Sequence, residues 1–326
     1  MQFLAAGGRN TIVLIFCFLL VVSIRFDRND LLIKRPLNDA TFYIANVQFL
    51  RGEPLTYQFK EPFNERLLVT AVAAILPFEP LTAINLANIF FLLLALYFLR
   101  QLLTALSLDE KYVWGGLYLF VFSFPTFYYS TIGYTDPGAL SMIFLGASSI
   151  YKNKYWLFIL AMILGTMAKE GIVILVPVAA AYAFSRDDKK WYFFSAAAIL
   201  IFFAITAVVK SNIAEHVNTP FFWKPRAWRI YFNFSRPNFY ISSILSFGIP
   251  GVIWLTFLFR ETSQVTNFLK QDLPLITGTL AAFLPWLFMI ISAFPDGRAF
   301  WIASCFPIAL AMVWWQRFGN PFKFKS

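Results

Sequence analysis

The residues best suited to chemistry gather in the segment 25–66, which is polar and charged within a largely apolar chain. The segment carries six of the chain's 17 acidic residues, namely Asp27, Asp30, Asp39, Glu53, Glu61 and Glu65. Basic residues are interleaved with them: Arg25, Arg28, Lys34, Arg35, Arg51, Lys60 and Arg66. A carboxylate can act as a general base, while lysine and arginine can hold an anionic phosphate. We therefore expect the reactive groups to lie in this segment.

Asp39 is the leading candidate for the base. It follows Asn38 at the start of a stretch that fits one short helix, whose apolar members are Phe42, Ala45, Val47, Phe49 and Leu50. This pattern is typical of a helix that lies on a membrane surface with a carboxylate at its capped end. A plain N-cap role for Asp39, which stabilises a helix by about 1 kcal/mol, explains the same pattern.

The composition predicts an all-α polytopic membrane protein. The 326 residues are 59% hydrophobic and 20% aromatic, and the mean hydropathy of +0.65 is far above that of soluble domains. The net charge of +10 comes from basic residues scattered over short loops, which argues against a nucleic-acid-binding stripe. Cys17 and Cys305 both fall inside apolar runs, so they give no support to a disulfide framework or a zinc site.

The apolar runs predict about ten transmembrane helices in a single domain covering residues 1–326. These runs are 11–24, 82–99, 112–130, 138–151, 155–168, 171–184, 191–209, 240–259, 273–292 and 300–315. The run 67–76 is too short to cross alone and fits a half-helix or re-entrant segment. Several runs are separated by only a few residues, which favours antiparallel neighbours in a compact bundle.

The basic residues of the short loops predict the orientation. One side carries Arg9, Arg100, Lys111, Lys152, Lys154, Arg186, Lys189, Lys190, Arg260, Lys270, Arg317, Lys323 and Lys325, and the other only Lys169 and Arg298. Because cytoplasmic loops are enriched in lysine and arginine, both termini are expected in the cytoplasm. The loops 25–66 and 210–240 then face outward, and the alternating aromatic and basic residues of 221–229 are expected at the lipid headgroups.

This orientation gathers further ionisable residues on the outward side. Asp136 opens a helix beside Pro137, and an ordinary N-terminal cap would account for it. Lys169 and Glu170 fit the turn between two spans, and Arg298 near Asp296 fits a surface ion pair. Charges near hydrocarbon nevertheless cost a few kcal/mol each unless they are paired or solvated. Their convergence on one side favours a site for a lipid that carries an anionic phosphate.

The order of these features resembles the GT-C superfamily of membrane glycosyltransferases, which includes protein O-mannosyltransferases and the aminoarabinose transferase of lipid A. The similar motifs are Asn38-Asp39-x-x-x-Tyr43 with Phe49-Leu50-Arg51-Gly52, Lys60-Glu61-Pro62-Phe63 with Arg66, Thr135-Asp136-Pro137, Lys169-Glu170, and Arg298-Ala299-Phe300-Trp301 with Pro307. The resemblance implies a bundle with surface helices in the first outward loop and an essential acidic residue near the start of that loop.

Carried over residue by residue, the resemblance implies catalytic roles for Asp39 and Asp136. It implies donor-phosphate binding by Lys60, Arg66, Lys169 and Arg298, with Tyr43, Glu61 and Glu170 in support. The first loop lacks a clear Asp-x-Asp or Glu-x-Asp pair, so a divalent metal stays an open alternative and no cofactor is assigned. No sizeable soluble domain follows the last span, which argues against a peptide acceptor of the oligosaccharyltransferase type.

The expected function is therefore an inverting glycosyltransferase that uses a polyprenyl-phosphate sugar on the non-cytoplasmic face of a bacterial plasma membrane. The acceptor is a lipid, a glycan or another molecule. A flippase or transporter of a lipid-linked sugar is the alternative, and a polysaccharide polymerase is a further one. A transporter calls for a polar cavity at mid-span, whereas a transferase calls for a pocket beside Asp39.

Overall fold

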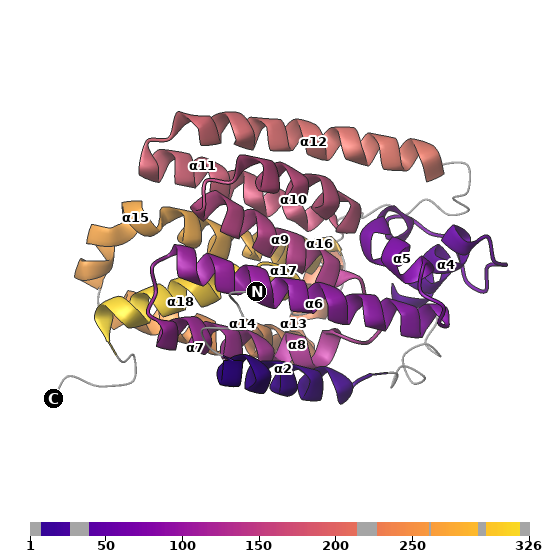
Figure 1. Ribbon diagram of the computed structural model, residues 1–326, viewed down its shortest axis with the longest axis horizontal. Coiled ribbons are helices and arrows are strands. Elements are labelled where there is room, and N and C mark those ends of the chain that lie inside the picture. Colours follow the sequence, from indigo (N-terminus) through magenta and orange to yellow (C-terminus); the bar gives the residue numbers. More distant parts are fainter. Residues whose placement is uncertain (1–7, 27–38, 214–226, 261, 293–297, 320–326) are drawn as a thin grey trace.

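The computed structural model describes residues 8–26, 39–213, 227–260, 262–292 and 298–319, and these residues form helices without a β-strand (Figure 1). The first half contains α2 (Gly8–Ser23), α4 (Asp39–Arg51), η1 (Phe63–Glu65), α5 (Leu67–Ala74), α6 (Pro80–Ala105), α7 (Glu110–Val121), α8 (Phe124–Tyr129) and α9 (Asp136–Tyr151). The second half contains α10 (Tyr155–Ala168), η2 (Glu170–Ile174), α11 (Leu175–Arg186), α12 (Lys189–Ile213), α13 (Ala227–Phe234), α14 (Pro237–Arg260), α15 (Thr262–Ala281), α16 (Phe283–Ser292), α17 (Arg298–Ile302) and α18 (Cys305–Phe318).

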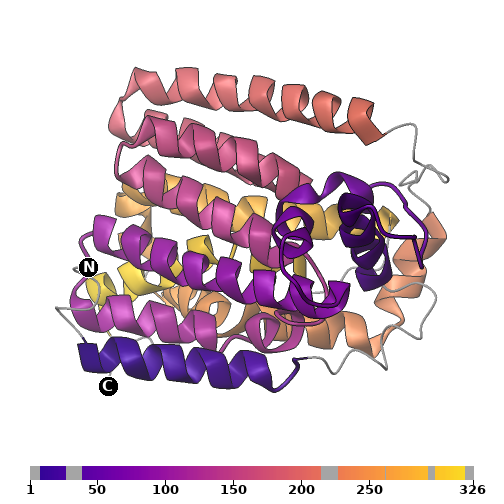
Figure 2. The ribbon, with the colours of Figure 1, turned by 45° about the vertical axis from the view of Figure 1, so that its right-hand side comes forward.

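The long helices lie side by side along the long axis of the molecule, as both ribbon views show (Figures 1 and 2). Four described helical stretches are long and apolar enough to cross a membrane: Pro80–Ala105, Lys189–Asn212, Pro237–Phe259 and Phe268–Ile291. The start of α2 and the end of α18 lie at the same end of the bundle (Figure 2). The structure therefore confirms an all-α protein with several potential membrane spans, while the number of crossings stays a prediction.

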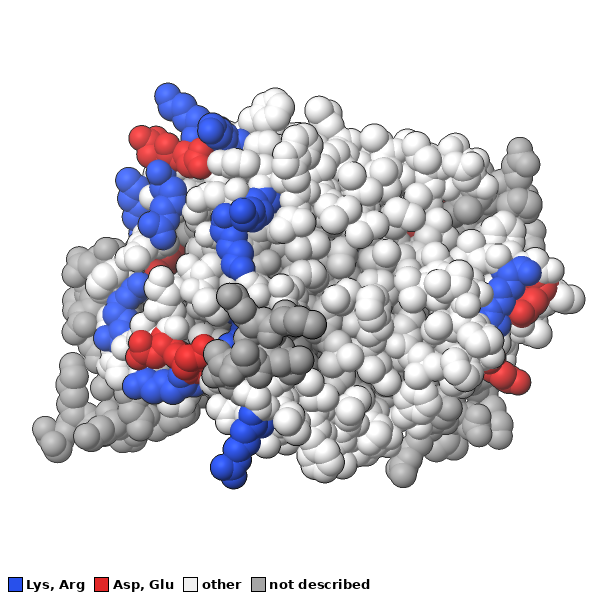
Figure 3. Space-filling model, in the orientation of Figure 1, with Lys and Arg blue, Asp and Glu red and all other residues white. Residues whose placement is uncertain are grey.

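Charged side chains occupy the two ends of this bundle. On the face shown in Figure 3, lysine and arginine gather at the left end, where α6 and α18 end and α7 and α15 begin. A broad uncharged belt follows, and a smaller group of acidic and basic residues lies at the right end, near α4 and α5. Such a belt between two charged ends is the surface expected of a bundle that crosses hydrocarbon. We call the right end, with α4, α5 and the start of α9, the acidic-loop end.

The central helix is α9, in which every residue from Asp136 to Ile150 is buried. It packs against α6, α10, α11 and α17, and small residues allow this close approach. A Cβ atom at Gly146 would lie only 2.2 Å from Leu175, and one at Gly138 only 2.5 Å from Val69. The packing of α9 fixes the position of Asp136, its first residue, at the acidic-loop end.

Four interruptions divide helices that the sequence predicted as continuous spans. The predicted span 112–130 is divided between α7 and α8, and 273–292 between α15 and α16. The span 300–315 begins in α17 and continues in α18, and α14 is kinked at Gly248, whose φ of 59° lies in the left-handed region. A proline follows each interruption by two or three residues: Pro125, Pro285, Pro307 and Pro250. Proline removes a backbone donor and clashes with the preceding turn, which explains the breaks.

The described part of the loop predicted to face outward is more deeply packed than the sequence suggested. The helix predicted after Asn38 does begin at Asp39, but α4 does not lie on the surface, because its residues from Ala40 to Gln48 are all buried. The predicted half-helix 67–76 appears as α5, which ends at Ala74. The Arg51 guanidinium joins the two helices by donating to backbone carbonyls in the last turn of α5 and just past it, those of Ala73, Ala74, Leu76 and Phe78.

The opposite end has a clamp of its own between α15 and α18. Asp272 is 4% exposed and accepts two hydrogen bonds from Arg317, at 2.6 and 3.2 Å, and one from Trp314 at 2.8 Å. The Arg317 guanidinium also lies 4.0 Å from the ring centroid of Phe268. The clamp holds the last described helix against the bundle far from the acidic-loop end.

Candidate functional site

Seven of the predicted site residues meet at the acidic-loop end, brought there by five different parts of the chain. They are Asp39 and Tyr43 from α4, Arg66 from the residue before α5, Asp136 from α9, Lys169 and Glu170 from the start of η2, and Arg298 from α17. We call this set the ionic ring.

Arg298 links the first loop to the core of the bundle. Its Nη1 donates to Asp39 Oδ2 at 3.0 Å and lies 3.7 Å from Asp136 Oδ2. The side chains of Asp39 and Arg298 are 23% and 15% exposed, so this ion pair lies at the edge of the ring. Residues 259 positions apart in the sequence are thus in direct contact.

Asp136 lies at the buried centre of the ring. Its side chain is only 3% exposed, and Lys169 Nζ donates to its Oδ1 at 2.5 Å. A carboxylate at this depth requires compensating charge, and Lys169 and Arg298 supply it from two sides. Asp136 is therefore more than the N-terminal helix cap that its place before Pro137 suggested.

Arg66 completes the other half of the ring. It is 7% exposed and donates to the Tyr43 hydroxyl at 2.7 Å and to Glu170 Oε1 at 2.8 Å. Burial raises the pKa of Tyr43 to about 12, although the Arg66 guanidinium acts to lower it. The Tyr43 hydroxyl consequently keeps its proton at neutral pH.

Residues that are close in the chain complete the ionic ring. Tyr43 lies one helical turn after Asp39 on the same side of α4, and Lys169 and Glu170 are neighbours in the chain. The ring contains three carboxylates and three cations, so its formal charge is zero when all six are ionised. An anionic ligand would upset this balance unless one carboxylate moved away.

Two tyrosines that the sequence analysis missed hold Arg298 in place. Its guanidinium carbon lies 4.2 Å from the ring centroid of Tyr134 and 5.9 Å from that of Tyr129. Tyr134 precedes Asp136 by two residues, so its place in a motif with a candidate acid was the available signal. An arginine between aromatic rings is stabilised by cation–π attraction and restricted in its rotamers.

The structure does not give the other two predicted residues a place in the ring. Lys60 and Glu61 lie in the turn before η1, where Lys60 Nζ packs over the Phe42 ring at 5.3 Å from its centroid. Asn38, Asp296 and the aromatic and basic residues of 221–226 lie outside the described residues.

The ring does not fit a divalent metal. Such a cation requires several converging carboxylate, carbonyl or imidazole ligands. Among the described residues no three of His, Cys, Asp or Glu converge in this way, and Asp39 and Asp136 both direct an oxygen at Arg298.

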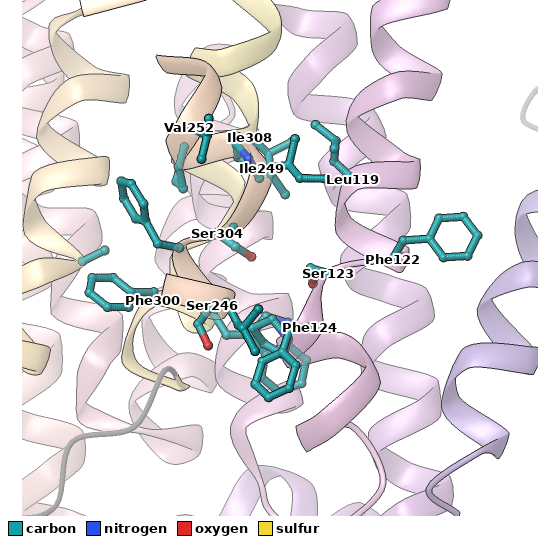
Figure 4. A pocket seen from close by; sticks show the side chains of 18 of the residues that line it. Leu119, Phe122, Ser123, Phe124, Ser246, Ile249, Val252, Phe300, Ser304 and Ile308 are labelled. Carbon is teal, nitrogen blue, oxygen red and sulfur yellow. The ribbon is translucent and has the colours of Figure 1, made fainter. Parts of the chain in front are cut away.

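A cavity of about 600 Å³ lies beside α17 (Figure 4). Phe300 and Trp301, which follow Arg298 in this short helix, line it together with residues of α7, α8, α14 and α18. All four helix interruptions reach its wall, at Ser123, Gly248, Ala282 and Ser304. Figure 4 shows Ser123, Ser246 and Ser304 among aromatic and aliphatic side chains such as Phe124 and Phe300.

The cavity opens on the apolar surface of the bundle. Ile244, Ile249 and Val252 of α14 and Phe122 after α7 line it, and each of them is more than half exposed. A hydrocarbon chain could enter from surrounding lipid without crossing water. Tyr129 lies between the cavity wall and the ionic ring. The centroid of its aromatic side chain is 6.4 Å from that of Trp301 in the cavity wall, and Arg298 of the ionic ring lies over the same aromatic side chain.

Comparison with known proteins leaves the chain without an identified relative. No family model, curated protein or solved structure matches it.

Proposed function

We propose that this protein is an inverting glycosyltransferase that takes a sugar from a polyprenyl-phosphate donor on the non-cytoplasmic face of a bacterial plasma membrane. The observation that carries the proposal is the ionic ring, where Asp39 lies within one cluster with Lys169, Arg298 and Arg66 at the end of an apolar bundle. A candidate base and several phosphate-binding cations are the parts that such a transfer requires. The acceptor is a lipid, a glycan or another hydroxyl-bearing molecule.

In the proposed reaction Asp39 accepts the proton of the acceptor hydroxyl. The acceptor oxygen attacks C1 of the sugar from the face opposite the phosphate, and the bond between C1 and the phosphate oxygen breaks. The electron pair of that bond leaves with the prenyl phosphate, whose added negative charge Arg298 and Lys169 stabilise. Charge stabilisation by groups already in place is a large contribution in such transfers.

The remaining ring residues support these groups. Asp136 keeps Lys169 and Arg298 at the ring, because both cations contact it. Glu170 and Tyr43 hold Arg66 in the same way. Arg66 is well placed to add positive potential behind the leaving group, since it is almost fully buried and always charged.

The cavity beside α17 supports a lipid-linked donor. Its walls are mainly aromatic and aliphatic, and Arg298 precedes two of its lining residues, Phe300 and Trp301. A donor with its chain in the cavity would bring its phosphate to the Arg298 side of α17. Hydrophobic burial of the chain would then contribute to the affinity for the donor.

A transporter of a lipid-linked sugar is the second candidate, and one observation favours it. Interrupted helices that line a cavity within the span are the usual construction of substrate sites in secondary transporters. Four interruptions surround this cavity, with Ser123, Ser246 and Ser304 as polar groups in its lining. Asp39 is not among the lining residues, so this cavity is not the pocket beside Asp39 that a transferase calls for. The described lining contains no Asp, Glu, Lys, Arg or His, however, and for this reason we prefer the transferase.

One experiment separates the two functions. The purified protein is placed in liposomes with short synthetic prenyl-phosphate sugars and a cell-envelope extract as the source of acceptors. A transferase releases prenyl phosphate and forms a glycoside of inverted configuration, detected by mass spectrometry and NMR. Movement of intact donor between leaflets without cleavage would instead establish the transporter. Lys111→Met, at the opposite end of the bundle, is the matched control and should leave turnover unchanged.

A further inference from the structure

The geometry points to an exchange of anions at Arg298: a phosphate takes the place of the Asp39 carboxylate, and Asp39 is released for the acceptor. The inference rests on the proposed function, because it assigns the donor phosphate to one side chain of the ring. It also adds a step that the function alone does not require. The candidate base and a candidate phosphate ligand are bound to each other in the structure, at 3.0 Å.

Asp39 and a donor phosphate cannot both bind Arg298 at the same time. The Nη1 atom that donates to Asp39 also lies 3.7 Å from Asp136, so its surroundings already hold two carboxylates. A phosphate brought to this nitrogen would place a third anion beside them. Like charges at such separations repel strongly in a partly buried site. One carboxylate must therefore move when a phosphate binds.

Asp39 is the carboxylate that moves. Asp136 is 3% exposed, is bound to Lys169, and begins the fully buried helix α9. Asp39 is 23% exposed and is the first residue of α4. Displacing Asp136 would leave a buried charge without its partners, whereas Asp39 can turn towards water at the edge of the ring.

Arg298 keeps its position during the exchange. Tyr134 and Asp136, both from the chain that leads into α9, contact the guanidinium independently of Asp39. Arg298 also precedes Phe300 and Trp301 of the cavity wall, so a phosphate on a chain emerging from the cavity would meet it first. Donor binding and release of the base are thereby coupled, and the donor must bind before the acceptor.

The competing exchange would occur at Arg66. Glu170 is 57% exposed and could leave Arg66 to a phosphate in a similar way. Arg66 has no described contact with the cavity residues, however, and its partner Tyr43 is a neutral hydroxyl. We therefore favour Arg298, and the experiment below distinguishes the two arginines.

The test measures how readily each carboxylate reacts with a water-soluble carbodiimide and an amine, using the full-length protein in detergent and mass spectrometry. Farnesyl phosphate is the probe, and its binding is measured separately by equilibrium dialysis. Saturating farnesyl phosphate should raise the labelling of Asp39 several-fold, while farnesol and inorganic phosphate should have smaller effects. Asp272, in the clamp at the other end, is the internal control and should not change.

Three outcomes of this labelling experiment would contradict the inference. If farnesyl phosphate binds and the labelling of Asp39 stays constant or falls, the exchange does not occur. If the labelling of Glu170 rises in place of Asp39, the phosphate binds at Arg66. If farnesyl phosphate does not bind at all, the proposal of a lipid-phosphate donor is itself wrong.

An Arg298→Met variant should show high labelling of Asp39, and farnesyl phosphate should no longer change it.

Discussion

Replacing Asp39 with asparagine is expected to lower kcat for sugar transfer by about 10²- to 10⁴-fold, the usual contribution of a general base. Asparagine has nearly the same shape and can still accept a hydrogen bond from Arg298, so the ionic ring should keep its arrangement. What asparagine cannot do is take a proton from the acceptor hydroxyl. The loss should therefore appear in kcat, measured with purified protein at saturating donor.

The dependence on donor concentration gives this prediction a second readout. Because Asp39 competes with the phosphate for Arg298, KM for the donor should stay constant or fall in Asp39→Asn. Glu79→Gln, which changes an exposed carboxylate before α6, is the matched control and should behave as wild type. Full activity in Asp39→Asn would exclude Asp39 as the base.

Replacing Asp136 with asparagine is expected to destabilise the protein strongly as well as inactivate it. The carboxylate is almost completely buried and pairs with Lys169 and Arg298, so its removal leaves Lys169 without its carboxylate partner and Arg298 with Asp39 alone. Breaking a buried ion pair in this way costs about 3–5 kcal/mol. The midpoint of thermal unfolding in detergent should fall well below that of wild type.

A double variant shows whether buried charge is the cause. Lys169→Met combined with Asp136→Asn removes one uncompensated cation along with the carboxylate, so its unfolding midpoint should recover much of the loss seen in Asp136→Asn alone. The difference between the single and double variants measures the coupling of the pair. An Asp136→Asn protein as stable as wild type would show that the ring does not depend on this carboxylate.

The sequence predicted much of the ring because charges in apolar surroundings are conspicuous. Asp136, Lys169 and Arg298 each stand at the end of an apolar run, and the charge asymmetry of the short loops places these ends on one side. That reasoning brings the residues to one surface but cannot give a distance. The contact between Asp39 and Arg298 depends on how α4 and α17 pack, which no local pattern encodes.

Other features were missed for physical reasons that can be named. Arg51 looked like one more charge in a polar loop, yet its guanidinium binds carbonyls at and beyond the end of α5 that only the folded backbone brings together. The burial of α4 also depends on its neighbours, because a short helix of mixed composition suits both a membrane surface and a protein interior. The helix interruptions did have a sequence signal, namely prolines such as Pro250 and Pro285 inside apolar runs.

The most direct test of the central claim is an experimental structure of the protein with a prenyl-phosphonate sugar, a donor analogue that cannot be cleaved. The account predicts that the phosphonate contacts Arg298 and Lys169, that the prenyl chain enters the cavity beside α17, and that C1 of the sugar faces Asp39. A phosphonate bound at the basic end near Arg317, or a sugar held among Ser123, Ser246 and Ser304 away from Asp39, would contradict it.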